Sequence, residues 1–419
     1  MLSKYLFHPL VLFWAPSTFA IGMWAVTPQF LMEIAHVRVF VDIKYVFQPL
    51  FLSFALFFIG MSLARVMRIS RWRFTGWSSK SIAQLQWYSS IIAVGAFGWL
   101  AITVIKDHGI QGIFNSEDVR GSYQPGLTTL VHLSTVCIVV AGVSLVVTKS
   151  WKSVCWVPFT AAVLVSAHRA FVGTERLALF IPLIAMFPAV FLVRFRRVRL
   201  KALGYLAFGV TGVAALFIFA EYFRSYSLKS ELGEDIERNP VVYGLQRLAL
   251  YYSLSVNAGA GSYEIFTNRD AANPLFANTL RPAAKLLYSD RNDGVERLHG
   301  IPVFKEEMLI ERGYFSHEFN NSWGVATPFL EGWVVAAFFW IFWAFLGTKL
   351  YYHAVKYRSD ICGLSLFGLF VAAFIDTQSR VLMLGEPHFV IPFCTILGWC
   401  FLTRVQLHGD CLSMSKTDH

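Results

Sequence analysis

Long apolar segments, each bounded by charged or turn-forming residues, follow one another along most of the chain. A bilayer core about 30 Å thick needs about 20 apolar residues for one helical crossing. Windows of this kind predict ten membrane-spanning helices, near residues 9–27, 47–66, 84–105, 126–148, 151–168, 178–195, 202–221, 327–348, 361–376 and 388–404. The pattern therefore indicates an all-α polytopic membrane protein.

One long interval interrupts this pattern. Residues 222–325 carry 13 of the 26 acidic side chains of the chain, and we expect them to form a large loop outside the membrane. Within this loop, Asn239-Pro240 is typical of a helix start, with Asn as the cap and Pro in the first turn. The residues that follow are too apolar for a solvated helix, so we expect it to lie on the membrane or to pack over the mouth of the bundle.

The predicted organisation has four parts. Residues 1–221 hold helices one to seven, 222–325 the large loop with interfacial helices, 326–404 the last three helices, and 405–419 a cytoplasmic tail. Residues 286–318 of the loop mix charged side chains with Gly and Pro, which favours turns and short helices.

Composition and charge agree with a membrane protein. Only 15% of the residues are charged and 56% are hydrophobic, whereas a soluble domain carries about 25% charged residues. The formal net charge is +10, and Lys and Arg concentrate in every second short connection, which the positive-inside rule assigns to the cytoplasm. We therefore expect both termini to be cytoplasmic and the large loop to be outside, and we do not expect nucleic-acid binding.

Signals for metals and cofactors are weak. The six cysteines have no close pairs at metal-ligand spacing and indicate neither a zinc site nor a disulfide framework: Cys137, Cys155, Cys362, Cys394, Cys400 and Cys411. The sequence shows no phosphate-cradling Gly-rich loop, zinc-type His motif or nucleophile elbow. We therefore expect no metal and no cofactor.

Two arginines flank a short segment between the fifth and sixth predicted spans. Arg169 and Arg176 are seven residues apart, which on an unbroken helix places them on the same side, roughly 10 Å apart. Two forked guanidiniums at the outer interface suit a diphosphate. The alternative is that they reach lipid phosphates and that one of them pairs with Glu175.

Other polar residues lie at the same side of the membrane. Four further arginines could add to an anion site, although each alone is more simply explained as structural: Arg120, Arg224, Arg281 and Arg380. Four ionisable residues in or beside the spans are site candidates by position, with pairing to an arginine as the simpler explanation: Glu331, Asp376, Glu386 and His388.

The run from Tyr314 to Gly324 is dense in polar and aromatic groups, directly before the eighth predicted span. His317 or Glu318 could act as general base toward a sugar hydroxyl, and the Asn, Tyr and Trp side chains suit sugar rings. Helix capping and an interfacial aromatic belt are the alternative explanation.

Together these features resemble the Wzy-type oligosaccharide repeat-unit polymerases of bacterial polysaccharide assembly, which are related to O-antigen ligases. The likeness covers nearly the whole chain. It depends on the ten spans, the large outer loop and the motifs Val119-Arg120-Gly121-Ser122-Tyr123, Gly173-Thr174-Glu175-Arg176, Asn320-Asn321-Ser322-Trp323-Gly324 with Pro328 and Gly332, and Ser379-Arg380.

The resemblance implies a glycosyltransferase bundle of the C type in the bacterial inner membrane, with its active site on the periplasmic side. Such enzymes move a growing glycan from undecaprenyl diphosphate onto a new lipid-linked repeat unit, without a nucleotide sugar and without a metal. The outer arginines would bind the donor diphosphate, and His317 or Glu318 would be the base. A chain-length regulator and a flippase are the partners that the family implies.

Three functions remain open at this point. The first is the polymerase; the second is an O-antigen-type ligase or another polyprenyl-phosphate-dependent glycosyltransferase, which would share the arginines and the loop. The third is a flippase or transporter of lipid-linked sugars, for which charged groups at mid-membrane along several helices are expected. One detail bears on the arginines: if Glu175 neutralises Arg176, Arg169 becomes the principal ligand of the diphosphate.

Overall fold

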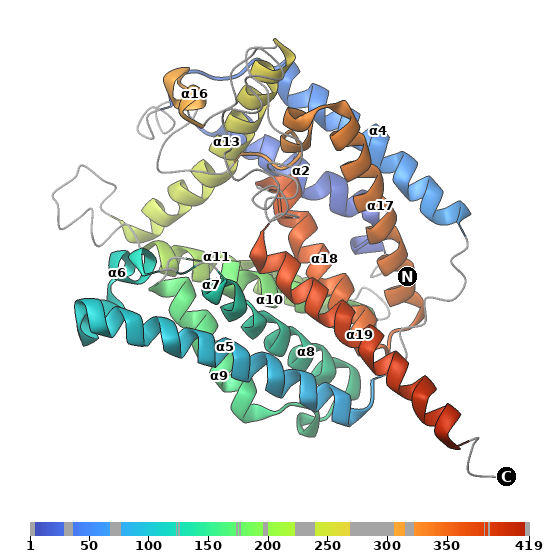
Figure 1. Cartoon of the computed structure of the whole chain (residues 1–419). Helices are drawn as coiled ribbons and strands as arrows, with labels where there is room; N and C mark the ends of the chain where they lie inside the picture. The colour runs from blue at the N-terminus through green and yellow to red at the C-terminus, as the bar shows by residue number, and fades with distance from the viewer. Residues whose placement is uncertain are drawn as a thin grey trace, which may run out of the picture.

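The computed structural model describes residues 5–28, 37–67, 77–122, 124, 126–172, 175, 177–195, 200–222, 239–268, 306–314, 322–380, 382–383 and 386–414. Every regular element within these ranges is a helix (Figure 1). Among these described residues, seven helical segments are long and apolar enough to cross a membrane: Pro9–Val26 (α2), Ile43–Val66 (α4), Ser79–His108 (α5), Leu127–Thr148, Leu177–Arg194 (α10), Trp333–Lys356 (α17) and Ile361–Ser379 (α18). The prediction of an all-α polytopic membrane protein is thereby confirmed at this level.

The other three predicted spans also fall on helices. They correspond to α9 (Trp156–Phe171), α11 (Leu200–Glu221) and α19 (Pro387–Met414). The described helix α9 has 16 residues, short for a crossing, so the count of ten crossings stays a prediction. Helix α19 continues to Met414, into the segment expected to be a tail. Short helical pieces complete the described part: η1 (Ile110–Phe114), α6 (Ser116–Gly121), η2 (Trp151–Ser153), α16 (Glu306–Glu311) and η4 (Thr327–Glu331).

Helices α10 and α18 pack against each other between two groups of helices. On one side, α5, α8 (Leu133–Thr148) and α9 pack together, and α10 packs on α8; on the other side, α4 packs along α17, and α2 contacts α18 (Figure 1). Helix α18 is almost entirely buried between them. At its closest approach to α10, a Cβ on Gly368 would collide with the carbonyl oxygen of Ala185. The absent side chain thus lets the two backbones touch, as is common between membrane helices.

A disulfide joins α18 to α19. Cys362 near the start of α18 and Cys400 in α19 are bonded. The sequence indicated no disulfide framework, and the pairing of residues 38 positions apart depends on how the two helices pack, which spacing along the chain does not show.

The helix expected in the large loop is present as α13 (Pro240–Thr267). The side chain of Asn239 accepts hydrogen bonds from the amides of Val241 and Val242, so the predicted start is confirmed. Figure 1 shows α13 running obliquely past the end of the bundle where α2 ends and α4 begins. Its second half is buried against α2, α4 and η4. This helix therefore belongs to the packed core of that end.

The eighth predicted span begins later than expected. Residues Thr327–Glu331 form η4, a short 3₁₀ helix, and α17 starts only at Trp333 after Gly332, whose φ is 100°. Gly adopts this left-handed backbone without a steric cost. The turn at Gly332 separates the two elements, and hydropathy does not distinguish them because both are apolar.

Candidate functional site

Arg169 lies inside the bundle, in the last turn of α9. Its relative exposure is 5%, so it does not reach into lipid. A cation in the last helical turn interacts favourably with the helix dipole, but burial of a guanidinium also demands direct partners. The structure provides two of them, His132 and Glu175.

His132 stands at a break between two helices. Helix α7 (Leu127–Val131) ends directly before it, α8 begins directly after it, and its backbone amide donates to the carbonyl of Thr129 in a tightened turn. Two Arg169 nitrogens, Nη1 and Nη2, lie 3.2 Å from Nδ1 and Nε2 of its ring. Arginine can only donate, and a neutral imidazole accepts through one of its two nitrogens, so a neutral His132 accepts one of these two contacts as a hydrogen bond.

Glu175 supplies the counter-charge. Its carboxylate pairs with Nη2 of Arg169, and the turn between α9 and α10 holds it there, because its amide donates to the carbonyl of Arg169 at 2.9 Å and its carbonyl accepts from Ala178 at 2.8 Å. The sequence raised the question whether Glu175 neutralises Arg176. In the structure its partner is Arg169, and Arg176 lies outside the described residues.

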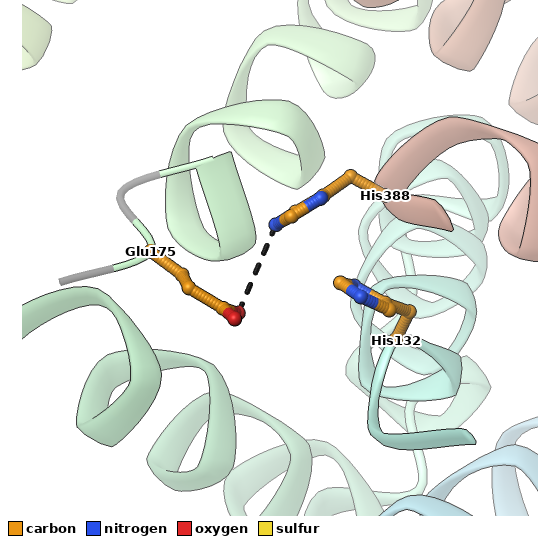
Figure 2. A group of neighbouring side chains, drawn as sticks. All are labelled: His132, Glu175 and His388. Carbon is orange, nitrogen blue, oxygen red and sulfur yellow. Dashed lines mark ion pairs between the residues drawn. The ribbon is translucent and has the colours of Figure 1, made fainter. Parts of the chain in front are cut away.

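His388 completes the cluster from the first turn of α19. Its ring centroid lies 4.2 Å from that of His132, and its Nε2 lies 3.8 Å from Oε2 of Glu175. Figure 2 shows the three side chains approaching one another from three different elements. Both ring nitrogens of His388 are buried, and neither has a hydrogen-bond partner within the described part of the chain. Such orphaned polar atoms are rare in folded proteins and require an explanation.

Arg380 lies near this cluster at the end of α18. Its Nε and Nη2 donate to the two carboxylate oxygens of Asp376 at 3.1 and 3.2 Å, and its guanidinium lies over the ring of Tyr251 at 5.9 Å. The expectation that Asp376 pairs with a nearby arginine is confirmed. Burial lowers the pKa of Arg380, but the charge and hydrogen bonds of Asp376, together with Tyr252 and Tyr251, raise this pKa overall. Both guanidiniums, of Arg169 and of Arg380, act electrostatically on His388.

The remaining predicted site residues cannot be placed in the same way. Arg120 belongs to α6, but its side chain lies outside what the structure describes. Five other predicted site residues lie entirely outside the described part of the chain: Arg176, Arg224, Arg281, His317 and Glu318. Of the six arginines expected to bind a diphosphate, the structure describes the side chains of two: Arg169, which lies in the cluster, and Arg380, which pairs with Asp376.

The space beside Arg169 is small. A cavity of about 20 Å³ lies against Arg169 and His168 and is otherwise lined mostly by apolar side chains of α5 and α7. This volume is enough for about one water molecule. Glu175 pairs with the guanidinium, so an anion that binds Arg169 directly would compete with this carboxylate.

His132 is not among the residues that the sequence predicts for the site. It lies in an apolar window from Leu127 to Thr148 that reads as an uninterrupted span, and its role depends on contacts with residues 37 and 256 positions further along the chain. One signal was available: an ionisable residue inside an apolar span is a candidate site residue by default.

The cluster has two chemical capacities. The buried guanidinium, with a carboxylate that can be exchanged for another anion, can bind phosphate oxygens. The two imidazoles and the carboxylate can hold a metal ion, since each of His132, Glu175 and His388 offers a ligand atom and these atoms lie within 4.8 Å of one another.

Comparisons with known proteins do not add a function. The chain matches no family model, no curated protein and no solved structure.

Proposed function

We propose that the chain is a membrane glycosyltransferase that polymerises undecaprenyl-diphosphate-linked oligosaccharide repeat units at the periplasmic face of the bacterial inner membrane. The observation that carries the proposal is the buried Arg169, held between His132 and Glu175 inside a bundle of apolar helices. A buried cation with a single carboxylate on one of its nitrogens is suited to exchange that carboxylate for a phosphate. The resemblance to Wzy-type polymerases supplies the reaction class.

In the proposed reaction the donor diphosphate takes the place of Glu175 on Arg169, and Arg380 adds a second positive charge. As the bond between the sugar and the diphosphate breaks, negative charge grows on the leaving oxygen. Preorganised donors act most strongly on charge that develops in the transition state. A general base takes the proton from the acceptor hydroxyl, and His317 and Glu318 remain the candidates for this role.

The placement of the acidic residues supports an enzyme over a transporter. A proton-coupled carrier calls for carboxylates that face a shared cavity at mid-membrane. Asp376 is engaged by Arg380 near the end of α18, and Glu331 lies in η4, before α17 begins. Both are thus near helix ends, so a flippase is the weaker alternative.

A product assay tests the proposal. Detergent-purified full-length protein, given lipid-linked repeat units as its only substrate, should produce a ladder of lipid-linked oligomers. A single product that appears only when a second acceptor is added would identify a ligase instead. Transfer of repeat units across proteoliposome membranes without any new glycosidic bond would identify a flippase, and either result would overturn the polymerase.

A further inference from the structure

His132, Glu175 and His388 form a set of three potential metal ligands within the bundle. They come from the break between α7 and α8, the turn between α9 and α10, and the first turn of α19 (Figure 2). We infer that these three residues bind a divalent transition-metal ion of the zinc class. The inference does not depend on the proposed function, and it departs from the metal-free chemistry that the family resemblance implies.

The spacing of the ligand atoms fits a metal ion. A zinc ion binds imidazole nitrogen and carboxylate oxygen at about 2.0–2.2 Å, which places the ligand atoms around one ion about 3–4 Å apart. The candidate atoms all lie within 4.8 Å of one another, and Nε2 of His388 is 3.8 Å from Oε2 of Glu175. Shifts of the ligand atoms by up to about one ångström would bring all three to these separations.

The two imidazoles differ in their hydrogen bonding. Among the described residues, His388 has no hydrogen-bond partner on either ring nitrogen, and both nitrogens are shielded from solvent. Both ring nitrogens of His132 lie 3.2 Å from Arg169 nitrogens, so the His132 ring must turn away from Arg169 to bind a metal. A buried polar atom without a partner costs about 1–3 kcal/mol, and a metal ion would satisfy one nitrogen of the His388 ring.

The type of ligands selects the type of metal. Two imidazoles and one carboxylate match zinc and related transition ions, whereas magnesium and calcium prefer oxygen ligands alone. Three protein ligands leave at least one coordination position open, which is the arrangement of catalytic rather than structural zinc sites. A phosphate oxygen or a water molecule could occupy that position.

Arg169 sets the strength of the site. Its positive charge opposes a second cation, and its contact with Glu175 competes for the carboxylate. When Glu175 turns one oxygen to the metal, Arg169 either keeps the other oxygen, as outer-shell partners of ligating carboxylates do, or is released toward an incoming anion. Removal of the guanidinium is therefore expected to tighten metal binding, although the same change would weaken the binding of an anion.

Metal binding can be measured on the purified full-length protein without any substrate. After chelator treatment and removal of the chelator, the protein is titrated with Co²⁺, followed by its visible absorption, and bound Zn²⁺ is quantified by elemental analysis. We expect one site per chain. His132→Ala and His388→Ala should each weaken it about a hundredfold or more, beyond the roughly 10–100-fold effect of losing an outer-shell partner.

Two further variants complete the test. His108→Ala changes a half-exposed histidine that pairs with Asp118, outside the cluster, and should leave metal binding unchanged. Arg169→Met should tighten it about tenfold, as expected for about 1.4 kcal/mol of relieved repulsion. Glu175→Gln leaves both imidazoles in place and keeps the inference testable if a histidine variant fails to fold; it should also lose the site.

The inference fails if wild-type protein binds Co²⁺ no better than the His132→Ala/His388→Ala double variant, or if Glu175→Gln binds as the wild type does. Because no substrate enters this titration, its failure leaves the polymerase proposal standing. Conversely, an absent oligomer ladder would not affect a measured metal site.

Discussion

Two buried polar clusters lie at the end of the bundle where α2 and α18 end. They differ in whether all their polar atoms have hydrogen-bond partners. Asn257 of α13 accepts hydrogen bonds from Trp24 Nε1 at 3.3 Å and the Val41 amide at 3.1 Å, and donates to the carbonyls of Val39 and Tyr314 at 3.0 and 2.9 Å. It therefore uses all four hydrogen-bonding positions of its amide. The cluster around Arg169 leaves both nitrogens of His388 without a partner among the described residues.

This difference separates a structural role from a binding role. A fully satisfied buried network fixes the chain segments that it connects, and Asn257 connects α13 with the segment before α4 and with Tyr314. A cluster with orphaned nitrogens is unfavourable until something binds to it. We therefore assign the packing of α13 to the Asn257 cluster and the chemistry to the Arg169 cluster.

The largest expected effect is the loss of activity in Arg169→Ala. Removal of one preorganised donor to a developing charge typically costs about 10²–10³ in rate, so oligomer synthesis should fall by at least about a hundredfold. Lys at this position should rescue poorly because it lacks the planar fork. Arg176→Ala is expected to act in the same way. The measurement is the length distribution of the oligomers, with size-exclusion profiles as the control for folding. Wild-type ladders from both variants would remove these arginines from the site.

Asn257→Leu should have the next largest effect, on stability rather than on chemistry. The change leaves the Val41 amide, the Trp24 indole and two carbonyls without their partner, and each such group costs about 1–3 kcal/mol when it stays dry. We expect a loss of about 2–3 kcal/mol in the free energy of unfolding in mixed micelles. The rate of oligomer synthesis per folded molecule should change little. A variant as stable as the wild type but inactive would reverse the roles of the two clusters.

Gly259→Ala tests how closely α13 packs beside Asn257. A Cβ at this position would lie 2.8 Å from the backbone nitrogen of Trp323 and 3.0 Å from its Cα, and Trp323 itself is fully buried. Overpacking of this kind costs about 1–3 kcal/mol. We expect thermal unfolding at a lower temperature, whereas Gly98→Ala on α5, which meets no atom within 4 Å, should leave it nearly unchanged. Equal melting temperatures for the two variants would contradict the packing.

The smallest effect is expected for Tyr314→Phe. The Tyr314 hydroxyl donates to Oε2 of Glu264 at 2.9 Å, and burial, together with this carboxylate, raises the pKa of Tyr314 to about 12. The hydroxyl therefore stays protonated, and remains a donor, up to strongly alkaline pH. Loss of this bond should cost about 1 kcal/mol in the free energy of unfolding at neutral pH. A larger loss would show that the Tyr314 hydroxyl stabilises the fold by more than this one hydrogen bond.

Much of the fold follows from the sequence because the burial of apolar side chains in the bilayer dominates it. Transfer of apolar side chains into a bilayer requires long apolar helices, and all ten expected segments fall on helices. The start of α13 was predictable from Asn239-Pro240, since a cap and a proline act locally. The break at His132 and the late start of α17 at Trp333 were not, because apolar windows on both sides conceal them.

The site was predictable only in part. The two arginines Arg169 and Arg380 could be selected because a guanidinium beside a membrane span needs a partner. Which partner it takes is a tertiary property: Glu175 pairs with Arg169, six positions back, and His132 and His388 meet across 256 positions of sequence. The one local signal at His132, an ionisable residue inside an apolar span, does not show which partners it meets.

The most direct test of the central assignment is ligand-induced stabilisation of the detergent-purified protein by undecaprenyl diphosphate. A ligand at 100 times its Kd stabilises the folded state by about 2.7 kcal/mol. We predict a clear rise in the melting temperature of the wild type and of Tyr314→Phe, and none for Arg169→Ala. An equal rise in Arg169→Ala would show that the diphosphate binds elsewhere and would contradict the account.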